Sequence, residues 1–120
     1  MRKLNYEDLR LMPLADVIAE ASMYGADELL ETKLRGIPSD GRGIYALYDG
    51  LGEILYVGKS ENVRKRLRNH LNCHEKITAR YAKDVQNVRV FYVDEEVKRQ
   101  NLYAVEKWFI THLAPKHNVV

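Results

Sequence analysis

The stretch that decides the fold runs from Gly43 to His70 and reads GIYALYDGLGEILYVGKSENVRKRLRNH. Two short apolar segments, residues 43–47 and 54–58, have the composition of strands. Residues 49–52 between them carry the Asp and Gly that tolerate the backbone angles of tight turns. The sequence therefore predicts a β-hairpin here.

Two tyrosines lie on this hairpin, and a basic helix follows it. If the turn is centred on its second and third residues, Tyr45 lies opposite Tyr56, and the two side chains share one face. The helix is predicted from Ser60 to about Asn72, and the Ser60 side chain can accept a hydrogen bond from a first-turn N–H. Facing tyrosines beside an arginine-rich helix are more polar than a core requires, which makes this a candidate site.

These residues resemble a known family. Gly43-Ile44-Tyr45 followed by Tyr56-Val57-Gly58 resembles the paired motif of the GIY-YIG nuclease superfamily, with Val57 at the variable middle position. Four further family positions are matched in order: Arg66 and His70 on the helix, Glu106 at the metal-binding glutamate, and Asn118 at the closing asparagine. The resemblance covers residues 41–120 and is strongest to the N-terminal incision domain of the bacterial nucleotide-excision-repair nuclease.

The resemblance implies a metal-dependent DNA endonuclease that hydrolyses phosphodiester bonds. A single Mg²⁺ (or Mn²⁺) would be held by Glu106, and Arg66 would neutralise charge that develops on the phosphate. Tyr45 or Tyr56 would accept a proton from the attacking water, and the residues leave the choice between them open.

The remaining polar residues of the motif have supporting roles in this interpretation. His70 would hydrogen-bond one tyrosine or relay protons, and Asn118 would hold the tail of the chain or a metal-bound water. Phosphate contacts that are blind to sequence are predicted for four basic residues near the start of the helix: Lys59, Arg64, Lys65 and Arg68.

The last helix gives a separate reason to single out Glu106. With about 100° per residue, Leu102, Val105 and Phe109 form a buried stripe, and Glu106 falls inside this apolar arc. A carboxylate that faces inward is costly unless it is paired with a cation or bound to a metal. The periodicity alone permits an internal arginine bridge as well as a metal, and the family resemblance favours the metal.

Charge divides the chain into two parts. Residues 1–40 carry five Lys and Arg against eight Asp and Glu, whereas residues 41–120 carry fourteen against nine. The basic part holds the motif, as a DNA-binding surface requires. The acidic part is predicted to be a helical extension that covers the sheet or mediates dimerisation, with one stripe at Leu14, Val17, Ile18 and Ala21 and a second helix from Asp27 towards Gly36.

The predicted fold is α+β, with a small, mainly antiparallel three-stranded sheet flanked by helices. Residues 88–93 alternate in polarity and supply the third strand. Residues 76–83 are predicted to be a short helix or loop, and an acidic run leads from residue 94 into the last helix. The division is a helical extension over residues 1–40 and a nuclease-like domain over residues 41–120.

Location and partners follow from weaker signals. The single cysteine, Cys73, rules out an internal disulfide framework and fits a reducing cytoplasm. The first residues lack the apolar core of a signal peptide, and no apolar run approaches the length of a membrane span. We expect a cytoplasmic protein whose partner is DNA, with no membrane contact and with a homodimer or a partner protein as further options.

Two alternatives to an active nuclease remain at this stage. One is a nucleic-acid-binding module of the same fold that has lost catalysis, although such a module would be expected to lack Glu106 or Arg66, and this chain has both. The other is a zinc-stabilised adaptor, because His70, Cys73 and His74 have a helical spacing that can bind Zn²⁺, with His112 or His117 completing the site.

Overall fold

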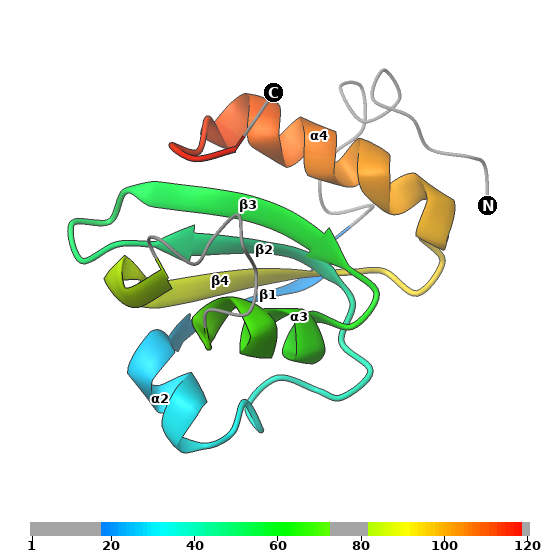
Figure 1. Cartoon of the computed structure of the whole chain (residues 1–120). Coiled ribbons are helices and arrows are strands. Elements are labelled where there is room, and N and C mark those ends of the chain that lie inside the picture. Colours follow the sequence, from blue (N-terminus) through cyan, green and yellow to red (C-terminus); the bar gives the residue numbers. More distant parts are fainter. Residues whose placement is uncertain (1–17, 73–81, 119–120) are drawn as a thin grey trace.

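A computed structural model describes residues 18–72 and 82–118 of the chain and has a four-stranded antiparallel sheet at its centre. The strand order is β1-β4-β2-β3, so β1 and β3 are the edge strands (Figure 1). The strands are β1 (Ile18–Gly25), β2 (Gly43–Tyr48), β3 (Ile54–Ser60) and β4 (Asn87–Val93). The helices are α2 (Ala26–Glu31), α3 (Val63–Leu71) and α4 (Leu102–Leu113), with 3₁₀ turns η2 (Ala82–Asp84) and η3 (Arg99–Asn101).

The two faces of the sheet are covered by different helices (Figure 1). On one face, α2 and α3 enclose a core that includes Leu29, Tyr45 and Leu67. On the other face, α4 lays its buried stripe, with Val105 and Phe109, over the sheet. Because β2 is buried on both faces, its residues serve both cores, and the edge strand β3 is the place where residues of α3 and α4 can meet.

The predicted helix across Ile18 and Ala21 is wrong, and the sheet has four strands where the sequence predicted three. Residues 18–25 form β1, which pairs with β4 from Ile18↔Val93 to Gly25↔Asn87. Leu14 and Val17 of the predicted helical stripe lie outside the described part of the chain. For residues 18–25, pairing with the otherwise open edge of β4 satisfies the backbone hydrogen-bonding groups of both strands. The stabilisation from this pairing exceeds the small local preference of these residues for a helix. The second predicted helix is present as α2, but it ends at Glu31 and not near Gly36, because Lys33 and Leu34 have left-handed backbone angles.

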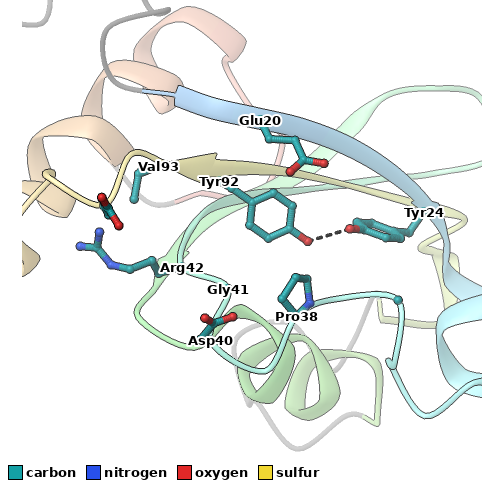
Figure 2. Close-up of a pocket in the computed structure, with 10 residues that line it drawn as sticks. Glu20, Tyr24, Pro38, Asp40, Gly41, Arg42, Tyr92 and Val93 are labelled. Carbon is teal, nitrogen blue, oxygen red and sulfur yellow. Dashed lines mark hydrogen bonds between the residues drawn. The ribbon is translucent and has the colours of Figure 1, made fainter.

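A pair of tyrosines links β1 to β4 beneath this pairing (Figure 2). The hydroxyls of Tyr24 and Tyr92 are 2.7 Å apart, and both rings pack against the core on the α2 and α3 face. Burial, followed by the hydrogen bond with Tyr24, raises the pKa of Tyr92. The two rings border a cavity of about 430 Å³ that also contacts Gly41 of the segment leading into β2.

The hairpin has a different register from the predicted one but keeps the predicted face. Tyr45 pairs with Gly58 and Leu47 with Tyr56, and an irregularity follows between Leu47 and Tyr48. The shift is two residues, and side chains alternate with a period of two, so Tyr45 and Tyr56 still share one face. Their ring centroids are 6.3 Å apart, which confirms the shared face.

The loop and the following helix begin with local hydrogen bonds. Asp49 Oδ1 accepts hydrogen bonds from the backbone N–H groups of Leu51 and Glu53, both at 2.9 Å, and the loop contains Gly52 with φ of 84°. The predicted Ser60 cap is wrong: Asn62 is the N-cap of α3, and its side chain accepts from the Lys65 N–H at 3.1 Å. Asn62 Oδ1 lies within reach of a free N–H of the first turn, so it displaces Ser60 from that role.

In the second half of the chain, the predicted strand and last helix are both present, and a 3₁₀ turn precedes the last helix. β4 occupies the predicted strand, and α4 buries Leu102, Val105 and Phe109 as its periodicity indicated. The acidic run does not lead directly into α4, because η3 intervenes. Most of the predicted helix or loop at 76–83 lies outside the described residues, and its end coincides with η2. Over 18–72 and 82–118, no helix is long and apolar enough to cross a membrane.

Candidate active site

Three aromatic residues cluster on the α3 face beside β3. The His70 ring lies 5.3 Å from the Tyr45 ring and 5.5 Å from the Tyr56 ring, measured between centroids. Tyr45 has no exposed surface, His70 is 2% exposed, and Tyr56 is partly exposed. The strands supply the two tyrosines on one face, and α3 brings His70 over them. Tyr56 is therefore the member of the cluster that solvent can reach.

The Tyr45 hydroxyl is the centre of a buried hydrogen-bond network. It lies 2.7 Å from His70 Nε2, and Arg66 Nε donates to it at 3.3 Å. Because a buried hydroxyl proton needs an acceptor, we assign Tyr45 as donor to an unprotonated His70 Nε2. Burial raises the pKa of Tyr45, and the Arg66 charge opposes this only in part. Tyr45 is thus held as a neutral phenol that positions Arg66 and His70.

Gly58 makes room for the Tyr45 ring. A Cβ placed on Gly58 would lie 2.5 Å from Tyr45 Cζ and would also collide with the hydroxyl. No real Cβ approaches an aromatic carbon so closely, so a larger residue would displace a ring that has no free volume around it. This contact explains physically why the second motif triplet ends in glycine.

Gly58→Ala is expected to lower the free energy of unfolding by about 1–3 kcal/mol through overpacking. Urea denaturation followed by circular dichroism measures the change. Gly36→Ala is the matched control, because its Cβ would meet only the Tyr24 ring, with the nearest atom, Cε1, at 3.5 Å, an ordinary contact. Equal unfolding midpoints for Gly58→Ala and the unchanged protein would show that the ring is not confined as described.

Glu106 approaches the same cluster from α4, on the other side of the edge strand. Its side chain is half-buried and receives a hydrogen bond from the backbone of Lys59, the residue after Gly58. Burial raises the pKa of Glu106, while the charges of Lys59 and Arg66 partly offset this rise. Glu106 also interacts electrostatically with Tyr45. The inward position predicted from helical angle is confirmed, and Arg66 is one of the cations that face it.

The donor set around Glu106 fits a hard divalent cation that keeps most of its water. In the described ranges, no three side chains of His, Cys, Asp or Glu come together as a metal cluster. One carboxylate would then be the protein ligand, and water and substrate oxygens would complete the coordination, which is a common arrangement for Mg²⁺.

Asn118 acts on the backbone of β3. Its Oδ1 accepts from the Val57 N–H at 2.8 Å, and its Nδ2 donates to the Val57 carbonyl at 2.8 Å. The two preceding residues continue this contact, because the N–H of Lys116 donates to Ile54 O and that of His117 to Leu55 O, both at 2.9 Å. Of the two predicted options for Asn118, this geometry matches the holding of the tail.

The four basic residues predicted to contact phosphates have different surroundings. Lys59, Lys65 and Arg68 are exposed. Arg64 instead donates from Nε to the Ile37 carbonyl at 2.6 Å, and so ties α3 to the segment after α2. Phosphate binding remains a prediction for all four. Arg64 is the least suited to it, because its guanidinium already donates to the Ile37 carbonyl.

The zinc alternative gains no support from the described residues. Cys73 and His74 lie outside them. His70 is occupied by Tyr45, and His112 stacks on Trp108 with centroids 4.1 Å apart and has its Nδ1 2.8 Å from the Trp108 carbonyl.

Comparison with solved structures supports the same architecture. The crystal structure of the GIY-YIG N-terminal endonuclease domain of UvrC from Thermotoga maritima, bound to its catalytic divalent cation magnesium, matches with a TM-score of 0.59 and 21% identity. The alignment covers 78% of this chain and 98% of that one. A point mutant of the same domain, also bound to the catalytic divalent cation, matches with a TM-score of 0.60 at 20% identity. At this identity, the likeness establishes the fold.

Comparison of sequences gives the family. UvrABC system protein C of Synechocystis is 34% identical over 104 residues, which are 86% of this chain and 16% of that protein. The corresponding protein of Dictyoglomus thermophilum is 30% identical over 76 residues, 63% of this chain and 12% of that protein. The chain thus spans less than a fifth of the length of these relatives. The family model described as UvrC-like GIY-YIG domain matches residues 41–119, and the chain belongs to that family.

Proposed function

We propose that the chain is a metal-dependent endonuclease that hydrolyses phosphodiester bonds in DNA. The observation that carries this proposal is the convergence of Glu106 from α4 and Arg66 from α3 beside the buried Tyr45 hydroxyl. A carboxylate kept half-buried beside cations and polar aromatic residues is costly for stability, and a cation-binding role explains its presence. Membership of a nuclease family supports the same interpretation.

When bound at Glu106, Mg²⁺ would polarise a phosphate oxygen and stabilise the leaving oxygen. Arg66 would neutralise charge that builds up on the phosphate, from a position fixed by its hydrogen bond to Tyr45. Lys59 is exposed next to Glu106 and would contact the same phosphate or its neighbour. Asn118 would keep β3 in place at Val57, between Tyr56 and Gly58.

Between the two tyrosines, we assign the general base to Tyr56. Tyr45 is fully buried, its hydroxyl is engaged by His70 and Arg66, and its raised pKa disfavours the phenolate that a base requires. Tyr56 is partly exposed on the same face and can meet a water molecule. His70 contacts both rings and would orient Tyr56 as well as accept the hydrogen bond of the Tyr45 hydroxyl.

The partners proposed for the chain are DNA and other proteins. The relatives are named as the C protein of a UvrABC system, and each is several times longer than this chain. We propose that the chain likewise works on DNA in bacterial repair together with partner proteins. Use of Mn²⁺, a homodimer and a cytoplasmic location remain predictions from the sequence.

Nicking of supercoiled plasmid tests the function directly. We expect conversion to open circles in Mg²⁺, and none in EDTA, because the reaction needs a divalent cation at Glu106. Gel electrophoresis over time measures the rate, and Ca²⁺ serves as a control for cations that bind without replacing Mg²⁺ in chemistry. Plasmid that stays supercoiled in Mg²⁺ and Mn²⁺, although the protein binds it, would favour the module without catalysis.

A further inference from the structure

A groove of about 540 Å³ opens beside the candidate active site. One wall is the end of β3, the turn after it and Arg66 of α3, and the other is η3 with the first turn of α4. Residues that line it are Lys59, Ser60, Glu61, Arg66, Arg99, Gln100, Leu102 and Tyr103. The backbone of Lys59 donates a hydrogen bond to Glu106, so the groove adjoins the proposed metal position.

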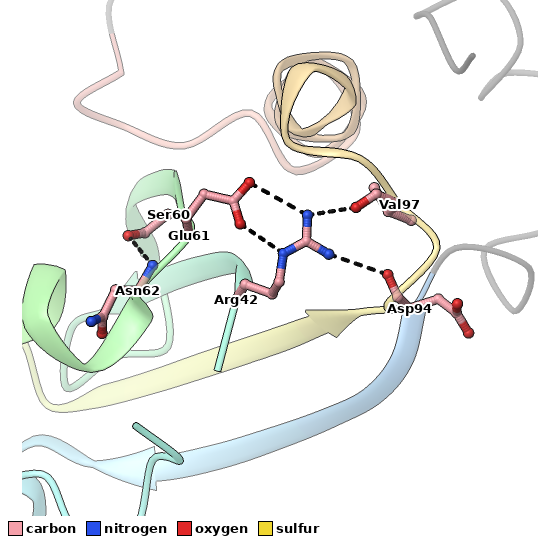
Figure 3. Close-up of polar contacts among 6 residues, drawn as sticks. All are labelled: Arg42, Ser60, Glu61, Asn62, Asp94 and Val97. Carbon is pink, nitrogen blue, oxygen red and sulfur yellow. Dashed lines mark hydrogen bonds and ion pairs between the residues drawn. The ribbon is translucent and has the colours of Figure 1, made fainter. Parts of the chain in front are cut away.

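The charge of this groove favours an anion. Three of its lining residues are cations: Lys59, Arg66 and Arg99. Its only lining carboxylate belongs to Glu61, which is paired with Arg42, with Arg42 Nε 2.7 Å from Glu61 Oε2 (Figure 3). Arg42 itself is not part of the lining. The pairing cancels the one negative charge at the rim, so the lining presents a net positive surface.

Arg42 also connects the two walls. Its guanidinium binds Glu61, on the β3–α3 turn, and donates to the backbone carbonyls of Asp94 and Val97, on the loop that leads to η3 (Figure 3). Buried or half-buried hydrogen bonds to a charged donor are stronger than neutral ones, so the bridge fixes the separation of the walls. The groove is therefore formed before any ligand arrives.

The α4 wall presents an aromatic ring next to the charges. Tyr103 is 57% exposed, which is unusual for a large ring, and Lys107 Nζ lies 5.6 Å from the ring centroid. Arg99, in η3, and Tyr103, in the first turn of α4, both line the groove. This wall therefore presents a cation and an exposed aromatic ring to the groove.

We propose that this groove binds the DNA strand next to the scissile phosphate. Arg99 contacts the adjoining phosphate, Tyr103 stacks on the base of that nucleotide, and Arg42 is a positioning residue that holds the two walls at a fixed separation. Alternation of cations and exposed aromatic rings is how proteins hold a single strand without reading its sequence. The inference rests on the proposed function, since it orients the substrate of the same site.

The test compares Arg99→Ala with Lys98→Ala, which removes the same charge from the preceding exposed residue, outside the groove lining. Affinity for a fluorescein-labelled single-stranded 30-nucleotide DNA is measured in EDTA by anisotropy at several salt concentrations. Loss of one phosphate contact on a single strand lowers the slope of log affinity against log salt by about 0.7 and weakens binding. We expect this for Arg99→Ala and a smaller change for Lys98→Ala.

The stacking role has its own pair of variants. Tyr103→Ala is expected to weaken binding about tenfold, whereas Tyr103→Phe keeps the ring and binds like the unchanged protein. If the substrate strand binds in the groove, Arg99→Ala should also raise the KM for plasmid nicking and leave kcat nearly unchanged.

Each outcome separates the two proposals. Equal affinities and equal salt slopes for Arg99→Ala and Lys98→Ala would overturn the proposal that the groove binds DNA, even if Mg²⁺-dependent nicking establishes the nuclease. Selective loss of affinity in Arg99→Ala and Tyr103→Ala, in a protein that nicks nothing, would uphold the groove and overturn the nuclease. Absence of any DNA binding by the unchanged protein would overturn both.

Discussion

Glu106→Gln is expected to reduce plasmid nicking in Mg²⁺ by about a thousandfold or more. The amide keeps the size of the side chain but loses the negative charge that would hold the cation. Lewis-acid stabilisation of a phosphate is worth several kcal/mol, and each 1.36 kcal/mol is about a tenfold change in rate. The rate of open-circle formation at saturating DNA is the measurement.

Glu95→Gln is the matched control for this variant, because Glu95 is an exposed carboxylate in the acidic run before η3. It should nick at nearly the unchanged rate. DNA affinity in EDTA should be retained or slightly increased in Glu106→Gln, since a negative charge beside the phosphate site is removed. Nicking by Glu106→Gln at a normal rate would refute the metal role of this residue.

The same variant has a second expected signature, in stability. Burial raises the pKa of Glu106 above its value in the unfolded chain, so the folded protein binds more protons between the two values. The free energy of unfolding contributed by this group therefore falls as pH rises through that window. Glutamine does not titrate, so the free energy of unfolding of Glu106→Gln does not fall in this way. In EDTA, we therefore expect the variant to become more stable relative to the unchanged protein as the pH rises from acid to neutral. Urea midpoints across pH measure it.

Arg66→Ala is expected to lower kcat for nicking by about a hundredfold to a thousandfold. Arg66 donates to the Tyr45 hydroxyl and interacts with Glu106, so its guanidinium is held before substrate arrives. Loss of one preorganised donor to a developing negative charge has this magnitude in other enzymes. Arg66→Lys keeps the charge without the fixed planar geometry and should recover only part of the rate.

Arg68→Ala supplies the comparison, because Arg68 is exposed on the same helix, two residues along the chain. At saturating DNA it should keep kcat and change only affinity. Urea unfolding of Arg66→Ala must be measured alongside, since the residue is partly buried. If Arg66→Ala retains kcat, or loses activity only in proportion to a loss of folded protein, Arg66 is a structural ion-pair partner and not part of the chemistry.

The site was predictable to the extent that local periodicity determined it. Tyr45 and Tyr56 were placed on one face although the register was wrong, because a shift of two residues leaves the face unchanged. Glu106 was identified as inward-facing from its angle among Leu102, Val105 and Phe109, and α4 has that orientation. Both inferences depend only on the regular side-chain period of a strand or a helix, which is two residues in a strand and about 3.6 in a helix.

Features that depend on distant pairings could not be predicted in this way. β1 forms because it can pair with the edge of β4. The composition of residues 18–25 does not indicate that β4 is the pairing partner. Arg42 precedes the first motif triplet, but its partners Glu61 and Val97 are 19 and 55 residues away. Arg99 and Tyr103 gain interest only once the groove beside Lys59 is known.

The contact of the closing segment with β3 has a consequence for self-association. β3 is an edge strand, and an edge strand exposes backbone groups to which a strand from another molecule can add. Lys116 and His117 occupy this edge with main-chain bonds, and Asn118 completes it at Val57 with a side-chain amide that imitates a peptide group. The residue that holds β3 at Val57 therefore also occupies backbone groups that a strand from another molecule would need, so one asparagine both orders the strand of the candidate site and blocks its use in an intermolecular sheet.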